Sequence, residues 1–124
     1  MRKTYVVSAK RSAIGSFLGS LTTVKPVDLG ATVVKALLED GKVAPEQVDE
    51  LLCGNVLSAG LGQNIGRQVA LAAGIPESVC SHSVNMVCGS GLRTVMEGVM
   101  SIQTGFNDIV VAGGVESMSG APYL

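Results

Sequence analysis

Short apolar runs alternate with longer segments of helical period along the whole chain, and this alternation restricts the fold more than any other feature of the sequence. Runs typical of strands cover residues 4–9, 82–87 and 108–112, with a further run inside 48–57. Segments with helical signals lie between these runs, at 25–41, 64–73 and 90–104. Strands that alternate with helices favour parallel pairing, with the helices packed on the faces of the sheet. The order therefore predicts an α/β fold with the element sequence βαβαβαβ.

Start and stop signals delimit the predicted helices. Pro26 suits the first helical turn, and Asp28 lies where the helix dipole favours a negative charge. Gly41 is the expected stop of this first helix, and Asn64 is the expected N-cap of the second. In the third helix, five apolar residues recur with helical period and predict a buried face: Leu92, Val95, Met96, Val99 and Ile102. This third helix is therefore expected to be a rigid, buried element.

The composition excludes several classes of partner. Nine Lys and Arg against ten Asp and Glu give a formal charge of −1 without any basic run, so nucleic acid and anionic membranes are poor partners. The chain has no apolar stretch of about 18 residues and no signal-peptide core, so we expect no membrane segment and a cytoplasmic location. Charged residues make up 15% of the chain, against about a quarter in an average domain. We interpret this low fraction as a sign that another chain, or further sequence, covers part of the apolar surface.

Two glycine patterns do not support a nucleotide site. Gly60, Gly62 and Gly66 miss the dinucleotide fingerprint by one residue, because that motif needs its glycines at fixed offsets to bring the backbone close to a pyrophosphate. Gly15 and Gly19 lack the Lys and the Ser or Thr of a P-loop.

Cys88 is the strongest candidate for a chemical role. It lies where the third predicted strand gives way to the third helix, and Gly89 and Gly91 follow it closely. The partial positive charge of a helix N-terminus stabilises a thiolate over a thiol, and the free amides there can bind an oxyanion that develops beside the sulfur. Cys88 can thus supply a nucleophile, with its own backbone N–H as an oxyanion donor. The alternative is that Cys88 is a small buried hydrophobic residue at a strand end, which is common for free cysteines.

The other cysteines and the only histidine have weaker claims. Three cysteines without a C-x-x-C spacing argue against disulfides and against a zinc site, so we expect free thiols and no metal. Cys53 lies in an apolar strand pattern and is expected in the core, whereas Cys80 is expected in a loop. His82 could serve as a base for Cys88 if the strand folded back, or could join Cys80 and Cys88 as a metal ligand, but that spacing matches no zinc pattern. A structural role for His82 is the favoured interpretation.

Two segments together resemble the thiolase family. Residues 84–92 read V-N-M-V-C-G-S-G-L and are similar to the segment that carries the nucleophilic cysteine of thiolases, in particular of acetyl-CoA acetyltransferases. Residues 113–119 read G-G-V-E-S-M-S and resemble the G-G-x-E-x-M-S segment that follows in that family. Further stretches agree in the same order, at 11–15, 62–68 and 72–76. The resemblance therefore covers nearly the whole chain.

The resemblance implies a reaction and an assembly. In thiolases the cysteine takes an acyl group from an acyl-CoA, and a second CoA thioester attacks the acyl-enzyme in a reversible Claisen condensation. By this resemblance Cys88 would carry the acyl group, and two acetyl-CoA would give acetoacetyl-CoA and CoA. Coenzyme A thioesters would be substrates, and no cofactor would be bound permanently. The family resemblance also implies a homo-oligomer, either a dimer or a tetramer, and a mixed sheet with helices on both faces.

The chain departs from the family in what it lacks. Thiolases take a histidine from a G-H-P segment, a second cysteine from a C-G-G-G segment and an asparagine from an N-E-A-F segment, and none of these occurs here. His82 does not replace the missing histidine, because it precedes the nucleophile in a strand where the family places no catalytic residue. We therefore expect residues 1–124 to be a partial thiolase N-terminal domain that is incomplete for the full reaction. The alternatives are a non-catalytic α/β interaction module or inactive fragment, and a 3-ketoacyl-CoA thiolase of longer acyl chains.

Overall fold

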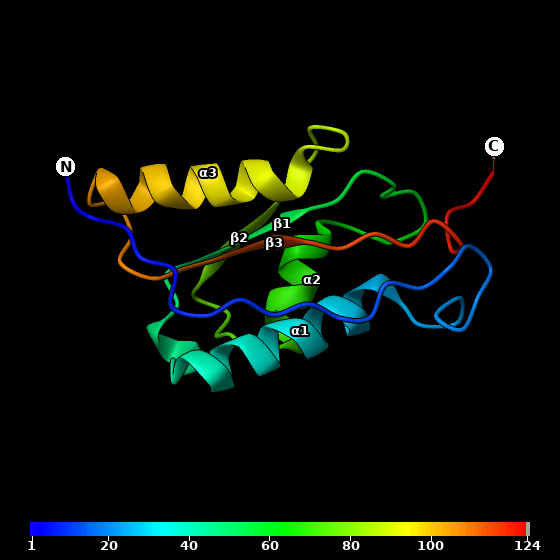
Figure 1. Ribbon diagram of the computed structural model, residues 1–124, viewed down its shortest axis with the longest axis horizontal. Coiled ribbons are helices and arrows are strands. Elements are labelled where there is room, and N and C mark those ends of the chain that lie inside the picture. The colour runs from blue at the N-terminus through cyan, green and yellow to red at the C-terminus, as the bar shows by residue number, and fades with distance from the viewer. Residues whose placement is uncertain (124) are drawn as a thin grey trace.

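Three parallel strands form the centre of the protein (Figure 1), whose computed structural model describes residues 1–123. β1 (Glu50–Gly54) lies between β2 (Cys80–Val84) and β3 (Val110–Gly114), and it pairs with both in parallel. In this register Leu52 lies between His82 on β2 and Ala112 on β3. The parallel pairing predicted from the alternation of elements is therefore confirmed for these three strands.

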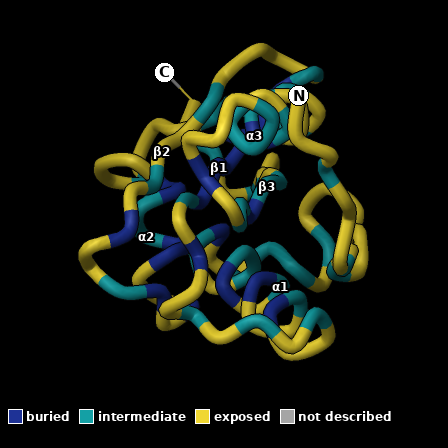
Figure 2. Tube along the Cα trace, turned by 90° about the vertical axis from the view of Figure 1, so that its left-hand side faces the viewer, coloured by how far each residue is buried: buried dark blue, intermediate teal, exposed yellow. Residues whose placement is uncertain are grey.

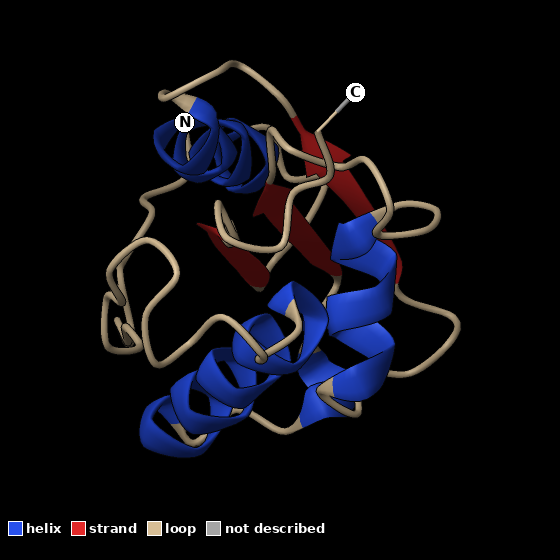
Figure 3. Cartoon of the chain, turned by 90° about the vertical axis from the view of Figure 1, so that its right-hand side faces the viewer, coloured by secondary structure: helices blue, strands red, loops and turns tan. Residues whose placement is uncertain are grey.

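Helices cover both faces of the sheet. α3 (Ser90–Gln103) lies on one side of the strands, and α1 (Pro26–Gly41) and α2 (Ile65–Ala72) lie on the other, as the turned view in Figure 3 also shows. α2 packs directly on β1 and β2, whereas α1 packs mainly against α2. A short 3₁₀ turn, η1 (Pro45–Gln47), connects α1 to β1. The α/β class with helices on both faces is confirmed, and within residues 1–123 no helix is long and apolar enough to span a bilayer.

The first predicted strand is not formed, so that expectation was wrong. Residues 4–9 run beside α1 without strand pairing, although a contact of 3.0 Å between Lys10 Nζ and Asp40 Oδ1 ties the segment to the end of that helix. A cavity of about 230 Å³ lies between this segment, β3 and α3. A β-branched run forms a strand only where a neighbour completes its hydrogen-bond ladder and covers its side chains. No strand of the sheet pairs with residues 4–9. Three side chains of this segment are also largely exposed: Tyr5, Val6 and Val7.

The missing strand also changes the character of the sheet. All pairing among the strands of residues 1–123 is parallel, so the mixed sheet implied by the family resemblance is not observed in them. β3 is consequently an edge strand on the side that faces residues 4–9.

The helix ends follow the sequence signals closely. α1 begins at Pro26 and ends at Gly41, but the left-handed residue that stops it is Lys42, with φ 52°. The Lys42 amide satisfies two of the last four carbonyl oxygens of the helix, those of Glu39 and Leu38. Asn64 caps α2 as predicted, because its Oδ1 accepts from the Arg67 amide at 3.2 Å.

The core lies mainly between β1 and the helices α1 and α2. Figure 2 shows the buried stretches concentrated along β1 and along the inward sides of these two helices. The most deeply buried apolar side chains include Leu51, Val48 and Val69. Around them pack Ala31, Val34, Leu38, Cys53, Ile65, Ala70, Ala73, Ile75, Val79 and Val111.

The predicted buried face of α3 is wrong. The residues of α3 that are buried against the sheet are Ser90, Thr94 and Gly98, which recur every four residues. These side chains are small, so the helix approaches the strands closely: a Cβ at Gly98 would lie 3.2 Å from the side chain of Val110. Of the predicted apolar stripe, Leu92, Val95 and Met96 are exposed, and Leu92 is 67% exposed, whereas Val99 and Ile102 are half-buried and line the cavity beside β3. α3 therefore buries its small face against the sheet and leaves Leu92, Val95 and Met96 exposed.

Candidate active site

Cys88 lies on the tight turn that leads from β2 into α3. β2 ends at Val84, and Cys88 is followed by Gly89, the N-cap of the helix. Val87, immediately before Cys88, has φ 51°, in the left-handed region that a β-branched residue rarely adopts. The thiol is exposed. The structure thus places Cys88 at the start of α3 and at the surface, so the alternative of a small buried residue is wrong.

Ser90 holds the turn that carries Cys88. Its hydroxyl donates to the Val87 carbonyl oxygen at 2.6 Å and accepts from the Met86 amide at 2.8 Å. The amides of Gly89 and Ser90 donate to the carbonyl oxygens of Met86 and Val87, each at 3.1 Å. Every residue from Met86 to Ser90 except Cys88 therefore takes part in these bonds.

The backbone amide of Cys88 is available to a ligand. No residue in the described part of the chain accepts from the amides of Cys88 and Leu92, whereas the Arg93 amide donates to the Gly89 carbonyl oxygen at 2.8 Å. Unsatisfied N–H groups in the first turn of a helix carry partial positive charge and bind anions. The Cys88 amide is thus a candidate donor to an oxyanion that develops on a carbonyl attacked by Cys88 Sγ.

His82 is engaged by carboxylates and not by Cys88. Its Nδ1 lies 3.5 Å from Glu50 Oε1 on β1, and its Nε2 lies 3.8 Å from Glu97 Oε2 on α3. Glu97 is also bound by Arg93 Nε at 2.7 Å. Within residues 1–123 no hydrogen bond joins His82 to Cys88, so this arrangement favours the structural role expected for the histidine.

The other two cysteines lie in different surroundings. Cys53 is 5% exposed on β1, in the core as predicted, and burial raises the pKa of its thiol to about 11. Cys80 is exposed and is the first residue of β2, not a loop residue as expected. Among the residues the structure describes, no group of three or more His, Cys, Asp or Glu side chains is arranged to hold a metal ion.

A polar junction that the sequence did not predict joins the ends of β1 and β3. The carboxylate of Glu116 accepts from Asn55 Nδ2 at 3.0 Å, from the Val56 amide at 3.0 Å and from the Leu57 amide at 2.9 Å. Asn55 itself is buried. The signal in the sequence was that Glu116 lies in the segment that resembles the G-G-x-E-x-M-S motif, but nothing there indicated its partners about 60 residues earlier.

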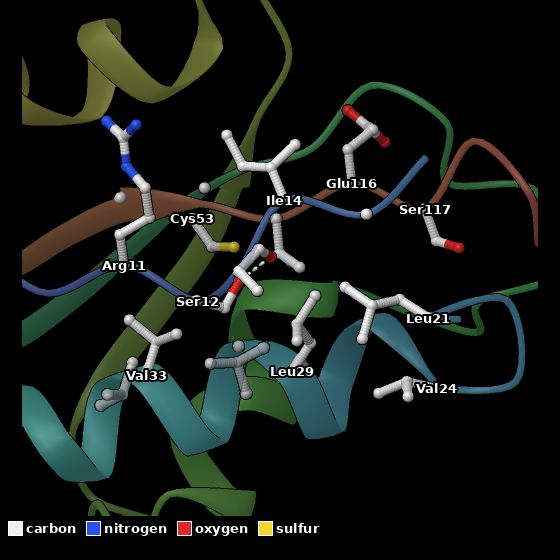
Figure 4. A pocket seen from close by; sticks show the side chains of 18 of the residues that line it. Arg11, Ser12, Ile14, Leu21, Val24, Leu29, Val33, Cys53, Glu116 and Ser117 are labelled. Atoms are coloured by element: carbon white, nitrogen blue, oxygen red, sulfur yellow. Dashed lines mark hydrogen bonds between the residues drawn. The ribbon is translucent and has the colours of Figure 1, made fainter. Parts of the chain in front are cut away.

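A second cavity lies on the face opposite α3 and does not include Cys88. It measures about 560 Å³ and lies between α1, residues 10–17 and the strands. Figure 4 shows apolar side chains of α1 below it, the Cys53 thiol directed into it from the sheet, and Glu116 at one end. Cys53 supplies the thiol among its lining residues, burial raises the pKa of that thiol to about 11, and Cys88 does not line the cavity, so we do not assign acyl chemistry to it.

The sequence of the chain is similar to a known family and to several known proteins. Residues 4–124 match the family described as "Thiolase, N-terminal domain". The acetyl-CoA acetyltransferase of Escherichia coli (strain K12) is 53% identical over 124 residues, which is 100% of this chain and 32% of that protein. The cytosolic acetyl-CoA acetyltransferase of Rattus norvegicus is 54% identical over 119 residues, which is 96% of this chain and 30% of that protein.

A solved structure supports the same comparison. The crystal structure of Acat5 thiolase from Ascaris suum in complex with coenzyme A superposes with a TM-score of 0.95 at 45% identity. The match covers 97% of this chain and 32% of that one. The chain therefore spans about a third of the length of these relatives.

Proposed function

We propose, since this chain belongs to the thiolase family and matches its N-terminal domain, that Cys88 carries an acyl group as a thioester in an acetyl-CoA C-acetyltransferase reaction. The observation that carries the proposal is the exposed Cys88 thiol immediately before the N-cap of α3, with a backbone amide that no described residue uses. Relatives named acetyl-CoA acetyltransferases, at about 50% identity over nearly the whole chain, support acetyl-CoA as the substrate.

The first half of the proposed reaction transfers the acetyl group to sulfur. The thiolate of Cys88 attacks the thioester carbonyl carbon of acetyl-CoA and forms a tetrahedral oxyanion, which the Cys88 amide stabilises. The bond from that carbon to the sulfur of coenzyme A then breaks. Coenzyme A leaves as a thiolate and takes up a proton, and the acetyl group stays on Cys88.

The second half of the proposed reaction forms a carbon–carbon bond. A base removes a proton from the methyl group of a second acetyl-CoA, and the resulting carbon nucleophile attacks the acetyl-enzyme. Acetoacetyl-CoA leaves and Cys88 returns as a thiolate. His82 is placed between Glu50 and Glu97, and no acid or base among residues 1–123 hydrogen-bonds to Cys88. We therefore place this base in residues outside this chain, within the remaining two thirds of a thiolase-length protein.

The proposed partners follow from the same reasoning. The Ascaris suum relative was solved in complex with coenzyme A, and this supports our proposal that the present chain binds acyl-CoA. The apolar stripe of α3 supports a homo-oligomer, either a dimer or a tetramer. Relatives from rat and mouse are named cytosolic, which supports the expected cytoplasmic location.

The second candidate function is a non-catalytic interaction module, and the exposed apolar face of α3 is the observation that favours it. The two functions differ in whether Cys88 reacts with a thioester. A 3-ketoacyl-CoA thiolase of longer chains is the alternative within the enzyme class, and comparing acetyl-CoA with longer acyl-CoA donors distinguishes it.

The test is acyl transfer to the protein. Incubation with acetyl-CoA followed by intact-mass measurement should give one acetyl adduct, and peptide mapping should locate it at Cys88. Cys88→Ser should lose the thioester adduct, and the matched variant Cys80→Ser should keep it, since Cys80 is also exposed. A folded protein that forms no adduct with acetyl-CoA or with longer acyl-CoA donors, or forms it equally in Cys88→Ser, would refute acyl transfer at Cys88 and favour the interaction module. Residues 1–124 alone should form no acetoacetyl-CoA at an enzyme-like rate.

A further inference from the structure

We propose that Asn55, held by Glu116, is a positioning residue for Cys88; the inference rests on the proposed acyl transfer at Cys88. Asn55 directly follows the last residue of β1, the central strand, and is 3% exposed. It has no contact with the thiol that would make it catalytic. Its role is to fix the position and direction of the turn on which Cys88 lies.

Asn55 connects the carboxyl ends of all three strands. Its backbone amide donates to the carbonyl oxygen of Val84 at 3.0 Å, and Val84 is the last residue of β2, four residues before Cys88. Its side-chain Nδ2 donates to the carbonyl oxygen of Val115 and to Glu116 Oε1, both at 3.0 Å and both just after β3. A movement of Asn55 would therefore shift the strand end from which the Cys88 turn departs.

The contacts of Glu116 require a carboxylate, because both of its oxygens accept hydrogen bonds and neither donates. Besides Asn55, it receives the amides of Val56 and Leu57, which are the next two residues of the chain after Asn55. Both carboxylate oxygens are used, Oε1 by two donors and Oε2 by one. An amide at position 116 would present one N–H₂ group toward these donors and would lose at least one of the bonds.

The first turn of α3 packs directly against Gly54, the residue before Asn55. A Cβ at Gly54 would lie 2.7 Å from the carbonyl carbon of Ser90 and 2.7 Å from the nitrogen of Gly91. Because Ser90 in turn binds Met86 and Val87, the position of β1 at its carboxyl end determines that of the turn around Cys88. The contacts thus run without interruption from Glu116 through Asn55 and Gly54 to Ser90.

The presence of Asn55 at this buried position is not explained by a gain in the stability of the fold. Its Oδ1 is buried and has no hydrogen-bond partner among the described residues. The orientation of the amide is determined, because Nδ2 faces two acceptors. An unpaired buried oxygen destabilises a fold, and an apolar residue would avoid it. This cost indicates that position 55 serves the geometry of the strand ends, in keeping with buried polar groups that specify one arrangement.

The experiment compares Glu116→Gln with Glu39→Gln, a variant of an exposed glutamate on α1. In each full chain, the rate of iodoacetamide alkylation at Cys88 is measured by peptide mapping across neutral and mildly alkaline pH, with exposed Cys80 as an internal reference. We expect the ratio of Cys88 to Cys80 alkylation to fall about tenfold in Glu116→Gln, a factor in line with the loss of a charge-assisted hydrogen bond. We also expect the Cys88 profile to move to higher pH. Glu39→Gln should match the wild type.

An unchanged Cys88 to Cys80 ratio in folded Glu116→Gln would overturn the proposal, as would an equal fall at both cysteines. Asn55→Ala is the stronger variant and should lower the same ratio further; if it does not fold, Glu116→Gln decides the matter. This readout does not depend on acetyl-CoA. A wild-type protein that forms no acetyl adduct would refute the proposed function, while a selective fall in alkylation at Cys88 would still support the positioning role.

Discussion

The Ser90 hydroxyl donates to the carbonyl oxygen of Val87 across 2.6 Å, and this contact closes the turn that presents Cys88. Ser90 is buried, although it precedes an exposed apolar stripe on the same helix. The same hydroxyl accepts from the Met86 amide at 2.8 Å. One small polar side chain therefore holds both sides of a turn in which Val87 adopts an unfavourable backbone conformation.

Removing this hydroxyl should loosen the turn. Ser90→Ala leaves the Met86 amide and the Val87 carbonyl oxygen without the partner they share, so we expect a loss of about 1–3 kcal/mol in the free energy of unfolding. Urea denaturation measures it. Ser78→Ala, at an exposed position, is the control and should change the free energy of unfolding by less than about 0.5 kcal/mol. Equal stability of the two variants would contradict the role given to Ser90.

The three thiols should react at different rates. Cys88 should be alkylated faster than Cys80 near neutral pH, because only Cys88 lies at the start of a helix with free amides. Cys53 should be the slowest, because it is buried and its pKa is raised to about 11. Limited iodoacetamide labelling with peptide mapping checks the order. Equal labelling of Cys80 and Cys88 would count against an activated thiolate.

Burial of Cys53 should also make stability depend on alkaline pH. Its pKa is raised from 9.0 to about 11, so the folded state favours the neutral thiol. The stabilising difference is fully present below about pH 9 and is lost as pH rises through about 11. A shift of this size corresponds to about 2–3 kcal/mol. The fall in the free energy of unfolding between these pH values should be smaller in Cys53→Ala than in the wild type, and parallel curves would disprove the assignment.

Two glycines near the start of α3 should respond in opposite directions to the same substitution. Gly54→Ala places a Cβ against the backbone of Ser90 and Gly91, and should destabilise the fold by about 1–3 kcal/mol. Gly91→Ala meets nothing within 4 Å and lies within α3, so it should stabilise by up to about 1 kcal/mol. Thermal or urea unfolding of the two variants checks both signs, and a neutral Gly54→Ala would show that α3 does not rest on β1.

The exposed face of α3 should govern association. We expect the chain to self-associate and to become less associated when Met96, which is 48% exposed, is replaced by Glu. Sedimentation velocity at several concentrations measures this, and Lys35→Glu on α1 is a control for added negative charge on an exposed helical position. A monomeric wild type, or equal association of both variants, would exclude this face as the interface.

Local signals determined much of the fold and the place of Cys88. Pro26 and Asn64 set helix starts through backbone geometry and capping, which depend on near neighbours in the chain. Cys88 was readable as a candidate nucleophile because a strand run, two glycines and a helical period meet around it.

Tertiary structure decided the features that depend on distant partners. The periodicity of α3 predicted a buried apolar stripe, but a row of small residues faces the sheet instead, because Gly98 and Thr94 allow the helix to approach the strands closely. Residues 4–9 have strand propensity, but a strand needs a ladder that the neighbouring edge does not form here. Glu116 binds residues about 60 positions earlier, and such pairing has no local signature. The sequence by itself determined where the thiol lies along the chain, whereas the packing of strand ends beneath α3 decided how it is presented.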